Sequence, residues 1–306
     1  MSARPRRPSL APSPTPDGLP LGGVTISHPE KLWWPNEGIT KLDVARFYAG
    51  VAPMLVPWMK DRPLAAERCP DGMLGDCFFQ KNFPEGLPAD VPTVPIAAAS
   101  TRQTVHYVVG GSRKTLLVLV NLGSIAVHVM NCRRRSLERP DWLAFDLDPE
   151  SGAFADAAQA GRLLQGILDE LGIRCYPKTS GGRGLHVLVP LRPGPTQDAV
   201  RAFASEVGRV MAERAPRLVT TEMSRARRRG RVFVDTLRNA FGQTIVAPYS
   251  VRRRPKAPIS TPLAWNEVHG KLDPADHNLR TFARRLAGAD PWADFWAHRQ
   301  SLPDPS

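Results

Sequence analysis

Residues 142–149 read WLAFDLDP, an apolar run that ends in acidic residues and a proline. The part Trp142–Leu147 predicts a short buried strand, because a brief apolar run bounded by turn residues is typical of one. Side chains two apart in a strand face the same side, so we expect Asp146 and Asp148 to project together near its end. This strand is the starting point for the fold and for the site.

Further elements follow this strand in a regular order. Apolar residues recur at helical spacing over residues 154–171, and Gly172 is typical of the position just past a helix. The segments Ile173–Tyr176 and Leu185–Leu191 are predicted to be strands with a glycine-rich turn between them. Thr196 can cap a second helix with apolar residues on one face, namely Val200, Phe203, Val207, Val210 and Met211.

A last alternating strand is predicted at Arg231–Thr236. The order is then β-α-β-β-α-β, the split βαβ arrangement of ferredoxin-like and RNA-recognition folds. The N-terminal part predicts a mixed α/β lobe with a helix near Lys41–Gly50 and strands around Leu64–Arg68, Cys77–Gln80 and Leu116–Val120. We therefore expect an α/β (α+β) chain with a disordered basic tail over residues 1–20 and a single domain over 21–300. Its N-terminal lobe would cover about 21–135 and its catalytic lobe about 136–300.

Composition favours a polyanionic partner. Of the 306 residues, 41 are Lys or Arg and 29 are Asp or Glu, which gives a net charge of +12. Lys and Arg neutralise phosphates, so nucleic acid comes first, although a general bias toward Arg would give the same excess. The apolar stretch Leu116–Met130 is too short to span a bilayer and no signal peptide is found, so a cytoplasmic protein is expected.

The four cysteines lie far apart along the chain, at Cys69, Cys77, Cys132 and Cys175. No C-x-x-C pair is present, so neither a zinc site nor a disulfide framework is expected. Free thiols suit a reducing cytosol.

Three acidic residues point to divalent metal chemistry. Asp146 and Asp148 would repel each other, and a cation between hard carboxylate oxygens, such as Mg²⁺ or Mn²⁺, would relieve that repulsion. Asp235, which ends the run VFVD at 232–235, could complete a two-metal site. Simpler interpretations exist for each, because the first two could form a solvated strand end and Asp235 could pair with Arg238.

Residues 178–186 read KTSGGRGLH, and successive backbone N–H groups in such a turn could face an anion. Lys178, Ser180 and Arg183 would add donors, although an ordinary glycine-rich hairpin has the same pattern. The order is not that of a Walker A loop. Arginine-rich runs at 225–231 and 252–256 flank Asp235 and fit a channel that follows phosphates, or solvated faces.

Together these motifs resemble the polymerase domain of bacterial DNA ligase D, in the archaeo-eukaryotic primase superfamily. The similarity covers residues 23–296. It rests on FFQKN at 78–82, DLDP at 146–149, TSGGRGLH at 179–186, VFVD at 232–235 followed by LRN at 237–239, and APYSVR at 247–252. Five motifs in the same order make the resemblance specific.

The resemblance implies a template-dependent nucleotidyltransferase (DNA-directed polymerase or primase) that adds NTPs or dNTPs to DNA with two Mn²⁺ or Mg²⁺ ions. It implies metal ligands at Asp146, Asp148 and Asp235, nucleotide contacts at His128, Ser180, Arg183, His186, Arg238 and Arg252, a 5′-phosphate site at Lys31 and Lys41, and template stacking by Phe78 and Phe79. Such enzymes favour ribonucleotides and fill gaps in non-homologous end joining. A Ku-type end-binding protein and a separate DNA ligase would then be partners, at the bacterial nucleoid.

The sequence departs from the family pattern at Arg183, where many relatives have Lys, and a forked guanidinium binds phosphate differently from an ammonium. The 306 residues contain no K-x-D-G adenylation motif, so a stand-alone polymerase is expected. A primase or gap-filling polymerase independent of end joining remains an alternative. So do a non-catalytic nucleic-acid-binding protein and a metal-dependent nuclease or phosphodiesterase. A lone His in an apolar run, such as His128, is more often a hydrogen-bonded core residue.

Overall fold

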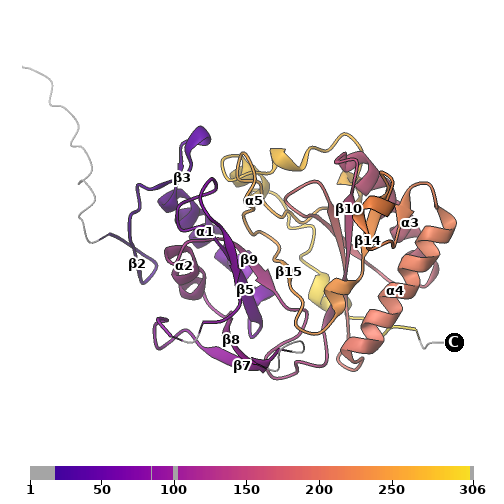
Figure 1. The fold of residues 1–306 in the computed structure, drawn as a ribbon, viewed down its shortest axis with the longest axis horizontal. Helices are drawn as coiled ribbons and strands as arrows, with labels where there is room; N and C mark the ends of the chain where they lie inside the picture. Colours follow the sequence, from indigo (N-terminus) through magenta and orange to yellow (C-terminus); the bar gives the residue numbers. More distant parts are fainter. Residues whose placement is uncertain (1–17, 84, 99–102, 304–306) are drawn as a thin grey trace, which may run out of the picture.

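The computed structural model describes residues 18–83, 85–98 and 103–303. The chain forms two lobes that lie side by side, and its C-terminal segment runs along both of them (Figure 1). The tail expected at residues 1–20 lies almost wholly outside the described residues. No helix in the described part of the chain is long and apolar enough to cross a membrane.

The N-terminal lobe is built on an antiparallel sheet in the order β15-β9-β5-β8-β7, with β6 paired to β5. These strands are β5 (Pro63–Arg68), β6 (Phe78–Gln80), β7 (Thr93–Ala97), β8 (Thr104–Val109), β9 (Ser124–Val129) and β15 (Ile245–Val246). Two small hairpins pair β1 (Leu19–Leu21) with β2 (Val24–Ile26) and β3 (Leu32–Trp34) with β4 (Ile39–Thr40). Strand β15 comes from far along the chain, so the C-terminal half completes this sheet.

Helix α1 (Lys41–Met59) begins where the sequence predicted a helix but continues beyond Gly50. Thr40 and Asp43 form a capping box, in which each side chain accepts the backbone N–H of the other. The helix runs through Pro53 and Pro57 because its apolar side is buried in the lobe. The predicted strands at Leu64–Arg68 and Cys77–Gln80 are confirmed as β5 and β6.

The prediction of a strand at Leu116–Val120 is wrong. These residues lie in helix α2 (Arg113–Asn121), which packs against α1 (Figure 1). The Ser112 hydroxyl accepts the Thr115 N–H at 3.1 Å and caps the first turn. A run of five apolar residues fits a buried strand or a fully buried helix equally well, so periodicity alone could not separate them.

The catalytic lobe confirms the predicted β-α-β-β-α-β order. Its elements are β10 (Trp142–Pro149), α3 (Phe154–Glu170), β11 (Tyr176–Thr179), β12 (Leu185–Pro190), α4 (Gln197–Arg214), β13 (Val219–Thr220) and β14 (Val232–Asp235). The sheet order is β11-β12-β10-β14-β13, and the short β13 adds a parallel edge strand to the predicted set. The side chains of Leu143, Phe145 and Leu147 pack with α3 and α4, which leaves the other face of the sheet toward the N-terminal lobe.

The strand expected at Ile173–Tyr176 lies later, at Tyr176–Thr179. The helix end explains the shift. Gly172 adopts a left-handed φ of 68°, and the Ile173 N–H donates to Leu168 O at 2.8 Å. The first residues of the segment therefore close α3 before the chain can join the sheet.

The expectation that the cysteines form no disulfide is also wrong. Cys69 follows β5 and Cys77 precedes β6, and the antiparallel pairing of these strands places Arg68 opposite Phe78. The two Cα atoms lie 4.4 Å apart and the sulfurs are bonded. The loop between them is too short to look like a framework in sequence, yet a hairpin brings its ends together. Cys132 and Cys175 are free and buried.

The C-terminal segment fastens the lobes together. It contains α5 (Phe282–Leu286) and the short 3₁₀ helices Trp265–Glu267, Pro274–Asp276 and Phe295–His298; other 3₁₀ turns lie at Pro35–Glu37, Arg225–Arg227 and Leu237–Asn239. Trp292, Phe295 and Trp296 contact the ring of Trp58 from α1, at centroid distances of 4.7–5.1 Å. Aromatic packing therefore joins the end of the chain to the first long helix.

A buried ion pair links the two lobes. Arg62, which precedes β5, is fully buried, and its Nη2 lies 2.5 Å from Asp141 Oδ1 at the start of β10. Arg133 Nε contacts the second carboxylate oxygen at 2.8 Å. The Arg62 guanidinium also lies against the rings of Trp142 and Trp296. Since both oxygens of Asp141 are used, loss of its charge would leave Arg62 without compensation.

We expect Asp141→Asn to destabilise the protein by about 3–5 kcal/mol, because a buried guanidinium would lose its counter-charge. Urea unfolding followed by far-UV circular dichroism measures this change. Glu170→Gln is the matched control, since Glu170 pairs with Arg214 at the surface. Equal unfolding midpoints for the two variants would show that the Arg62–Asp141 pair does not stabilise the junction of the lobes.

Candidate active site on the catalytic sheet

Four polar side chains form one row across the catalytic sheet. Asp146 on β10 lies opposite His186 on β12 and opposite Asp235 on β14, and His186 lies opposite Lys178 on β11. Asp146 alternates with Phe145 and Leu147, which face the helices, so the row lies on the face toward the N-terminal lobe. We call Lys178, His186, Asp146 and Asp235 the polar row.

The three predicted metal ligands therefore share one face of the sheet. Arg238, from the 3₁₀ turn after β14, bridges two of them, since its Nε lies 3.5 Å from Asp146 Oδ2 and 3.2 Å from Asp235 Oδ2. Asp148 lies two residues beyond Asp146 on the same face and is exposed. The structure thus brings Asp146 and Asp235 into one charged cluster and places Asp148 beside it.

Burial and neighbouring charges both shift the pKa values of these carboxyl groups. Burial would raise the pKa of Asp146, but His186, Arg238 and Lys178 outweigh it and hold that pKa well below its usual range. Burial and then the charge of Asp146 raise the pKa of Asp148. Burial also raises the pKa of Asp235 against the charge of Arg238, and Asp146 adds to the rise. The repulsion among the three is what a cation would relieve.

The oxygens of these three carboxylates suit a hard divalent cation, although the Arg238 side chain occupies the position between Asp146 and Asp235. Within the described ranges no group of three or more His, Cys, Asp and Glu side chains is arranged to hold a metal ion. The Arg238 guanidinium lies between Asp146 and Asp235 and takes the place of a cation there. Its side chain is 38% exposed, so it can move aside for an ion bound by carboxylate oxygens.

Lys178 lies on β11, within the polar row, instead of on the glycine-rich turn. It is fully buried, and its Nζ donates to His186 Nδ1 at 2.9 Å and to Ser260 Oγ. Burial, and then the charge of Lys178, lowers the pKa of His186 to about 4, so the ring is neutral at pH 7. Asp146 is ionised and can only accept, so His186 Nε2, 3.3 Å away, carries the ring proton. Lys178 thereby fixes the tautomer that faces Asp146.

Asn239 is a residue of the site that motif spacing did not single out. Its side chain is fully buried, its Oδ1 accepts the Ala144 N–H at 2.8 Å, and its Nδ2 donates to Ala144 O at 2.8 Å. These two bonds take the place of the backbone hydrogen bonds that a neighbouring strand would make with β10 just before Asp146. The run LRN at 237–239 was the available signal, since Arg238 contacts the carboxylates and Asn239 holds β10 from the same turn.

The glycine-rich turn closes around Ser180. The Ser180 hydroxyl accepts the N–H groups of Gly182 and Gly184, both at 3.2 Å. Gly181 has a φ of 71°, and a Cβ there would lie 2.4 Å from Arg252 Cγ, so only glycine fits. Arg252 Nη1 donates to Ser180 O at 3.3 Å. The turn is therefore held by its own serine and by Arg252.

His128 stands on β9 with a buried Nε2 that has no hydrogen-bond partner in the described part of the chain. Burial, and then the charge of Arg252, lowers the pKa of His128 well below its usual value, so the ring is neutral. The ring of Phe79 meets it edge-on at a centroid distance of 5.1 Å. Phe78 and Phe79 are 48% and 56% exposed. An orphaned buried nitrogen beside exposed aromatic rings indicates a surface that receives a ligand.

Lys31 and Lys41 lie near each other but are bound differently. Lys41 Nζ donates to Ser27 O at 2.8 Å and to Asn121 O at 2.9 Å. Burial, and then the charge of Lys31, lowers the pKa of Lys41 to about 8. Lys31 is half-buried and its Nζ pairs with the exposed Asp71 at 2.5 Å. The loop closed by the disulfide therefore supplies the counter-charge of Lys31.

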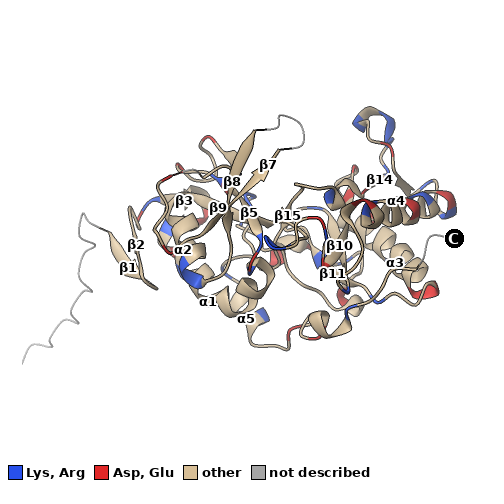
Figure 2. Ribbon diagram, turned by 90° about the horizontal axis from the view of Figure 1, so that it is seen from below, with Lys and Arg blue, Asp and Glu red and all other residues tan. Residues whose placement is uncertain are grey.

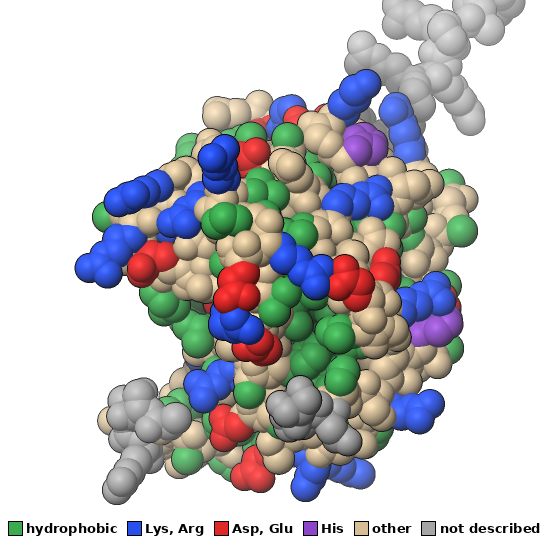
Figure 3. Space-filling view, turned by 90° about the vertical axis from the view of Figure 1, so that its right-hand side faces the viewer, with side chains coloured by type: hydrophobic (Ala, Val, Ile, Leu, Met, Phe, Trp, Pro, Cys, Tyr) green, Lys and Arg blue, Asp and Glu red, His purple; other side chains and the backbone are tan. Residues whose placement is uncertain are grey.

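Basic side chains lie near these sites. The arginine-rich loop before β14 extends from the end of the catalytic lobe (Figure 2). On the face shown in Figure 3, Lys and Arg are spread among acidic side chains. Arg228 of this loop lies over the ring of Phe233, 3.8 Å from its centroid. The charges of Arg228 and Arg225 act to lower the pKa of Asp148, although burial and Asp146 raise it overall.

Comparison with known proteins settles the family. The chain matches the family described as LigD, primase-polymerase domain, over residues 40–292. The chain belongs to this family. It is 37% identical over 285 residues to the multifunctional non-homologous end joining protein LigD of Pseudomonas aeruginosa, across 92% of this chain and 34% of that protein.

Other relatives agree with this assignment. The bifunctional non-homologous end joining protein LigD of Bacillus subtilis is 32% identical over 277 residues, across 90% of this chain and 44% of that protein. The polymerase domain of Mycobacterium tuberculosis ligase D in complex with DNA has a TM-score of 0.82 and 28% identity, across 90% of this chain and 99% of that domain. The chain thus spans less than half the length of these curated LigD relatives. The resemblance and the fold class expected from sequence are confirmed.

We expect Lys178→Met to release the tautomer of His186, because Nδ1 would lose its donor. Nitrogen-15 NMR of the histidine rings at pH 7 measures this directly. The wild-type ring should be protonated at Nε2 alone, whereas the variant should show a mixture of both tautomers. Lys178→Arg keeps a donor and is the matched control. An unchanged His186 spectrum in Lys178→Met would show that Asp146 alone determines the tautomer.

Proposed function

We propose that this chain is a template-dependent nucleotidyltransferase that adds NTPs or dNTPs to a DNA 3′ end. The polar row carries the proposal, because a non-catalytic binder of DNA gains nothing from carboxylates that face a polyanion. The family and its solved relative in complex with DNA support DNA as the substrate. Gap filling and end processing in non-homologous end joining, or in other DNA repair, would be its role, with a Ku-type protein and a separate ligase as partners.

Asp146, Asp148 and Asp235 would hold two Mg²⁺ or Mn²⁺ ions. When bound, such ions activate the attacking hydroxyl and neutralise the charge of the triphosphate. The chain's own contribution is to keep the three carboxylates fixed on one face. His186 and Arg238 hold Asp146 ionised, and Asn239 keeps β10 in place just before it.

The nucleotide would lie between the polar row and the N-terminal lobe. His128 offers an unpartnered Nε2, and Arg252 has an Nε without a hydrogen-bond partner among the described residues. Ser180 and Arg183 stand on the glycine-rich turn, where the sequence predicted a triphosphate. His186 would act through Asp146, whereas Arg238 would turn from the carboxylates to the nucleotide once metal ions replace it.

In this proposal both lobes, which divide at about residues 135–136, contribute to the site. Phe78 and Phe79 would stack on template bases from the N-terminal lobe, since every base has a π-face. Activity would then need both lobes. De novo dinucleotide synthesis on an unprimed strand would distinguish a primase from a gap-filling polymerase.

Alanine substitution of Asp146, Asp148 or Asp235 should lower the rate of nucleotide addition at least about 10³-fold, because each substitution removes a ligand from the two metal ions that these residues share. Primer extension on gapped DNA, with NTPs or dNTPs and with Mg²⁺ or Mn²⁺, measures the loss. Fluorescence anisotropy should show that DNA affinity is kept, since a negative charge has gone. Asp198→Ala on α4 is the exposed control. Extension at the control rate by any of the three variants would exclude two-metal catalysis by these residues.

A 5′-phosphate on the downstream strand of a gap should tighten binding about tenfold through Lys31 and Lys41. Because the pKa of Lys41 is about 8, its ammonium charge is present at pH 7 and lost as the pH rises above 8. The advantage of the phosphorylated gap should therefore be larger at pH 7 than at pH 9.

Anisotropy titrations with and without the 5′-phosphate test this pocket. Lys31→Ala should lose most of the difference between the two DNAs, and Lys60→Ala, an exposed lysine at the end of α1, should keep it. A wild-type protein that binds both DNAs equally at pH 7 contradicts the assignment.

A further inference from the structure

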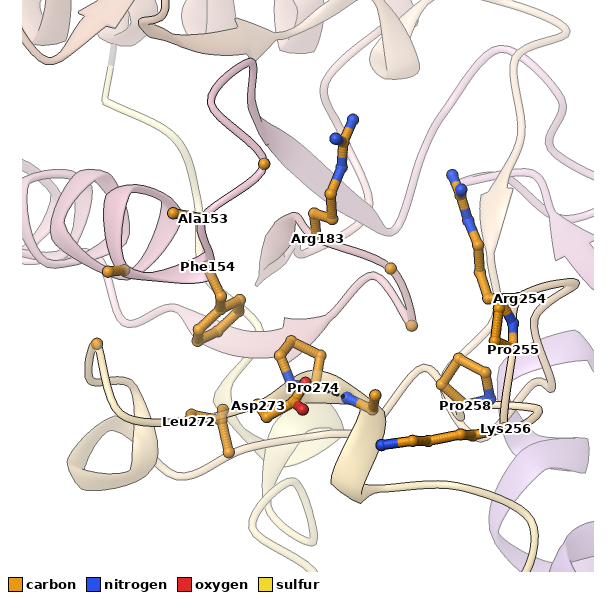
Figure 4. Close-up of a pocket in the computed structure, with 16 residues that line it drawn as sticks. Ala153, Phe154, Arg183, Arg254, Pro255, Lys256, Pro258, Leu272, Asp273 and Pro274 are labelled. Carbon is orange, nitrogen blue, oxygen red and sulfur yellow. Dashed lines mark hydrogen bonds between the residues drawn. The ribbon is translucent and has the colours of Figure 1, made fainter.

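A cavity of about 450 Å³ lies on the outer side of the glycine-rich turn (Figure 4). It is bounded by residues 152–155, 181–183, 254–256, 258, 270 and 272–275. Three cationic side chains line it, those of Arg183, Arg254 and Lys256. Asp273 is the acidic residue of the lining, and one of its oxygens accepts the Ala275 N–H at 2.9 Å. The cavity is therefore positively charged overall.

These three cations have no ion pair and no side-chain hydrogen bond within the described part of the chain. By contrast, Arg214 is paired with Glu170 and Arg285 with Glu267. Figure 4 shows the guanidinium groups of Arg183 and Arg254 extending toward the same side of the cavity. Unpaired guanidinium and ammonium groups around one cavity are what a phosphate anion binds.

The wall that carries two of the cations is held in a strained shape. Lys256 and Ala257 have φ values of 68° and 51°, in the left-handed region that residues other than glycine rarely adopt. Trp34 Nε1 donates to Arg254 O at 2.7 Å, and Lys256 N–H donates to Glu37 Oε1 at 2.7 Å. Such strain persists only where surrounding contacts impose it, and it is common at ligand sites. In Figure 4 the Lys256 side chain extends into the cavity.

The cavity adjoins the polar row across a single turn of chain. Arg252 contacts Ser180 O from the inner side of the glycine-rich turn, and Arg183 lies on the same turn at the cavity. Arg183 also reaches the loop that follows β10, because its Nη1 lies 2.9 Å from where a Cβ on Gly152 would stand, and Asp148 lies near the end of that strand. An anion released beside Asp148 would therefore meet Arg183 first and Arg254 and Lys256 next.

We propose that this cavity binds inorganic pyrophosphate, the product of nucleotide addition. This assignment rests on the proposed function. In that reaction the 3′-hydroxyl oxygen bonds to the α-phosphorus and its proton passes to water. The bond from the α-phosphorus to the bridging oxygen breaks, and pyrophosphate leaves with that oxygen and the electron pair. Phe154, Pro258 and Pro274 form an apolar base to the cavity, which reduces the water that would screen its charges.

Calorimetric titration of the full chain with inorganic pyrophosphate, without metal, DNA or nucleotide, tests the site. Arg254→Gln/Lys256→Gln should bind pyrophosphate at least about tenfold more weakly than wild type. Arg46→Gln/Lys60→Gln removes the same charges from exposed positions on and after α1 and should bind as wild type does. In primer extension, inhibition by pyrophosphate should weaken by a similar factor in the cavity variant alone. Thermal melting confirms that all three proteins are folded.

Equal pyrophosphate affinity in the cavity variant and the control would overturn the inference. So would a loss of affinity for a single-stranded oligonucleotide without any loss for pyrophosphate, because the cavity would then contact a DNA strand. Failure of the proposed function is recognised separately. A wild-type protein that binds pyrophosphate through Arg254 and Lys256 but adds no nucleotide would refute the polymerase activity and keep the anion site.

Discussion

The ionised carboxylate of Asp146 is the constraint on which the catalytic lobe depends. It lies on a strand between two others, where an unpaired charge would cost several kcal/mol, so neighbouring elements supply hydrogen-bond donors and a positive charge. His186 comes from β12 and Arg238 from the turn after β14. Lys178 supports His186 from β11. Residues on or beside four strands thus stabilise one ionised carboxylate. The face of the sheet that carries it must stay accessible to a ligand, so a helix cannot cover it.

The balance of charge around this carboxylate favours a further anion. Burial, and then the charge of Arg252, lowers the pKa of Lys178 and of His128. Burial lowers the pKa of Arg252 as well, against the attraction of Glu67 and Asp146. Positive groups are therefore crowded on one side of the site, and carboxylates that repel one another lie on the other side. A triphosphate with its divalent ions would satisfy both sides together.

Local sequence predicted the strand of Asp146 and Asp148 because a period of two needs no knowledge of neighbouring strands. It could not place Asp235 opposite Asp146, since that pairing depends on the register between strands far apart in the chain. The roles expected for His128 and Arg252 came from the family resemblance, because a lone His or Arg has no local signature. Lys178 was taken for a ligand contact, and only packing shows that it is buried behind His186 in the polar row. The Cys69–Cys77 bond was missed for a similar reason, because a hairpin joins residues that spacing keeps apart.

Strand β15 shows how closely the two lobes depend on each other for folding. It follows every strand of the catalytic sheet in the chain, yet it completes the sheet of the N-terminal lobe beside β9. The N-terminal sheet therefore cannot be finished until more than a hundred further residues have been made and folded. Contacts of such long sequence separation slow folding and make it cooperative. A chain that stops before residue 245 would therefore leave the edge of β9 beside His128 unpaired, although β10 and β14 would already carry their carboxylates.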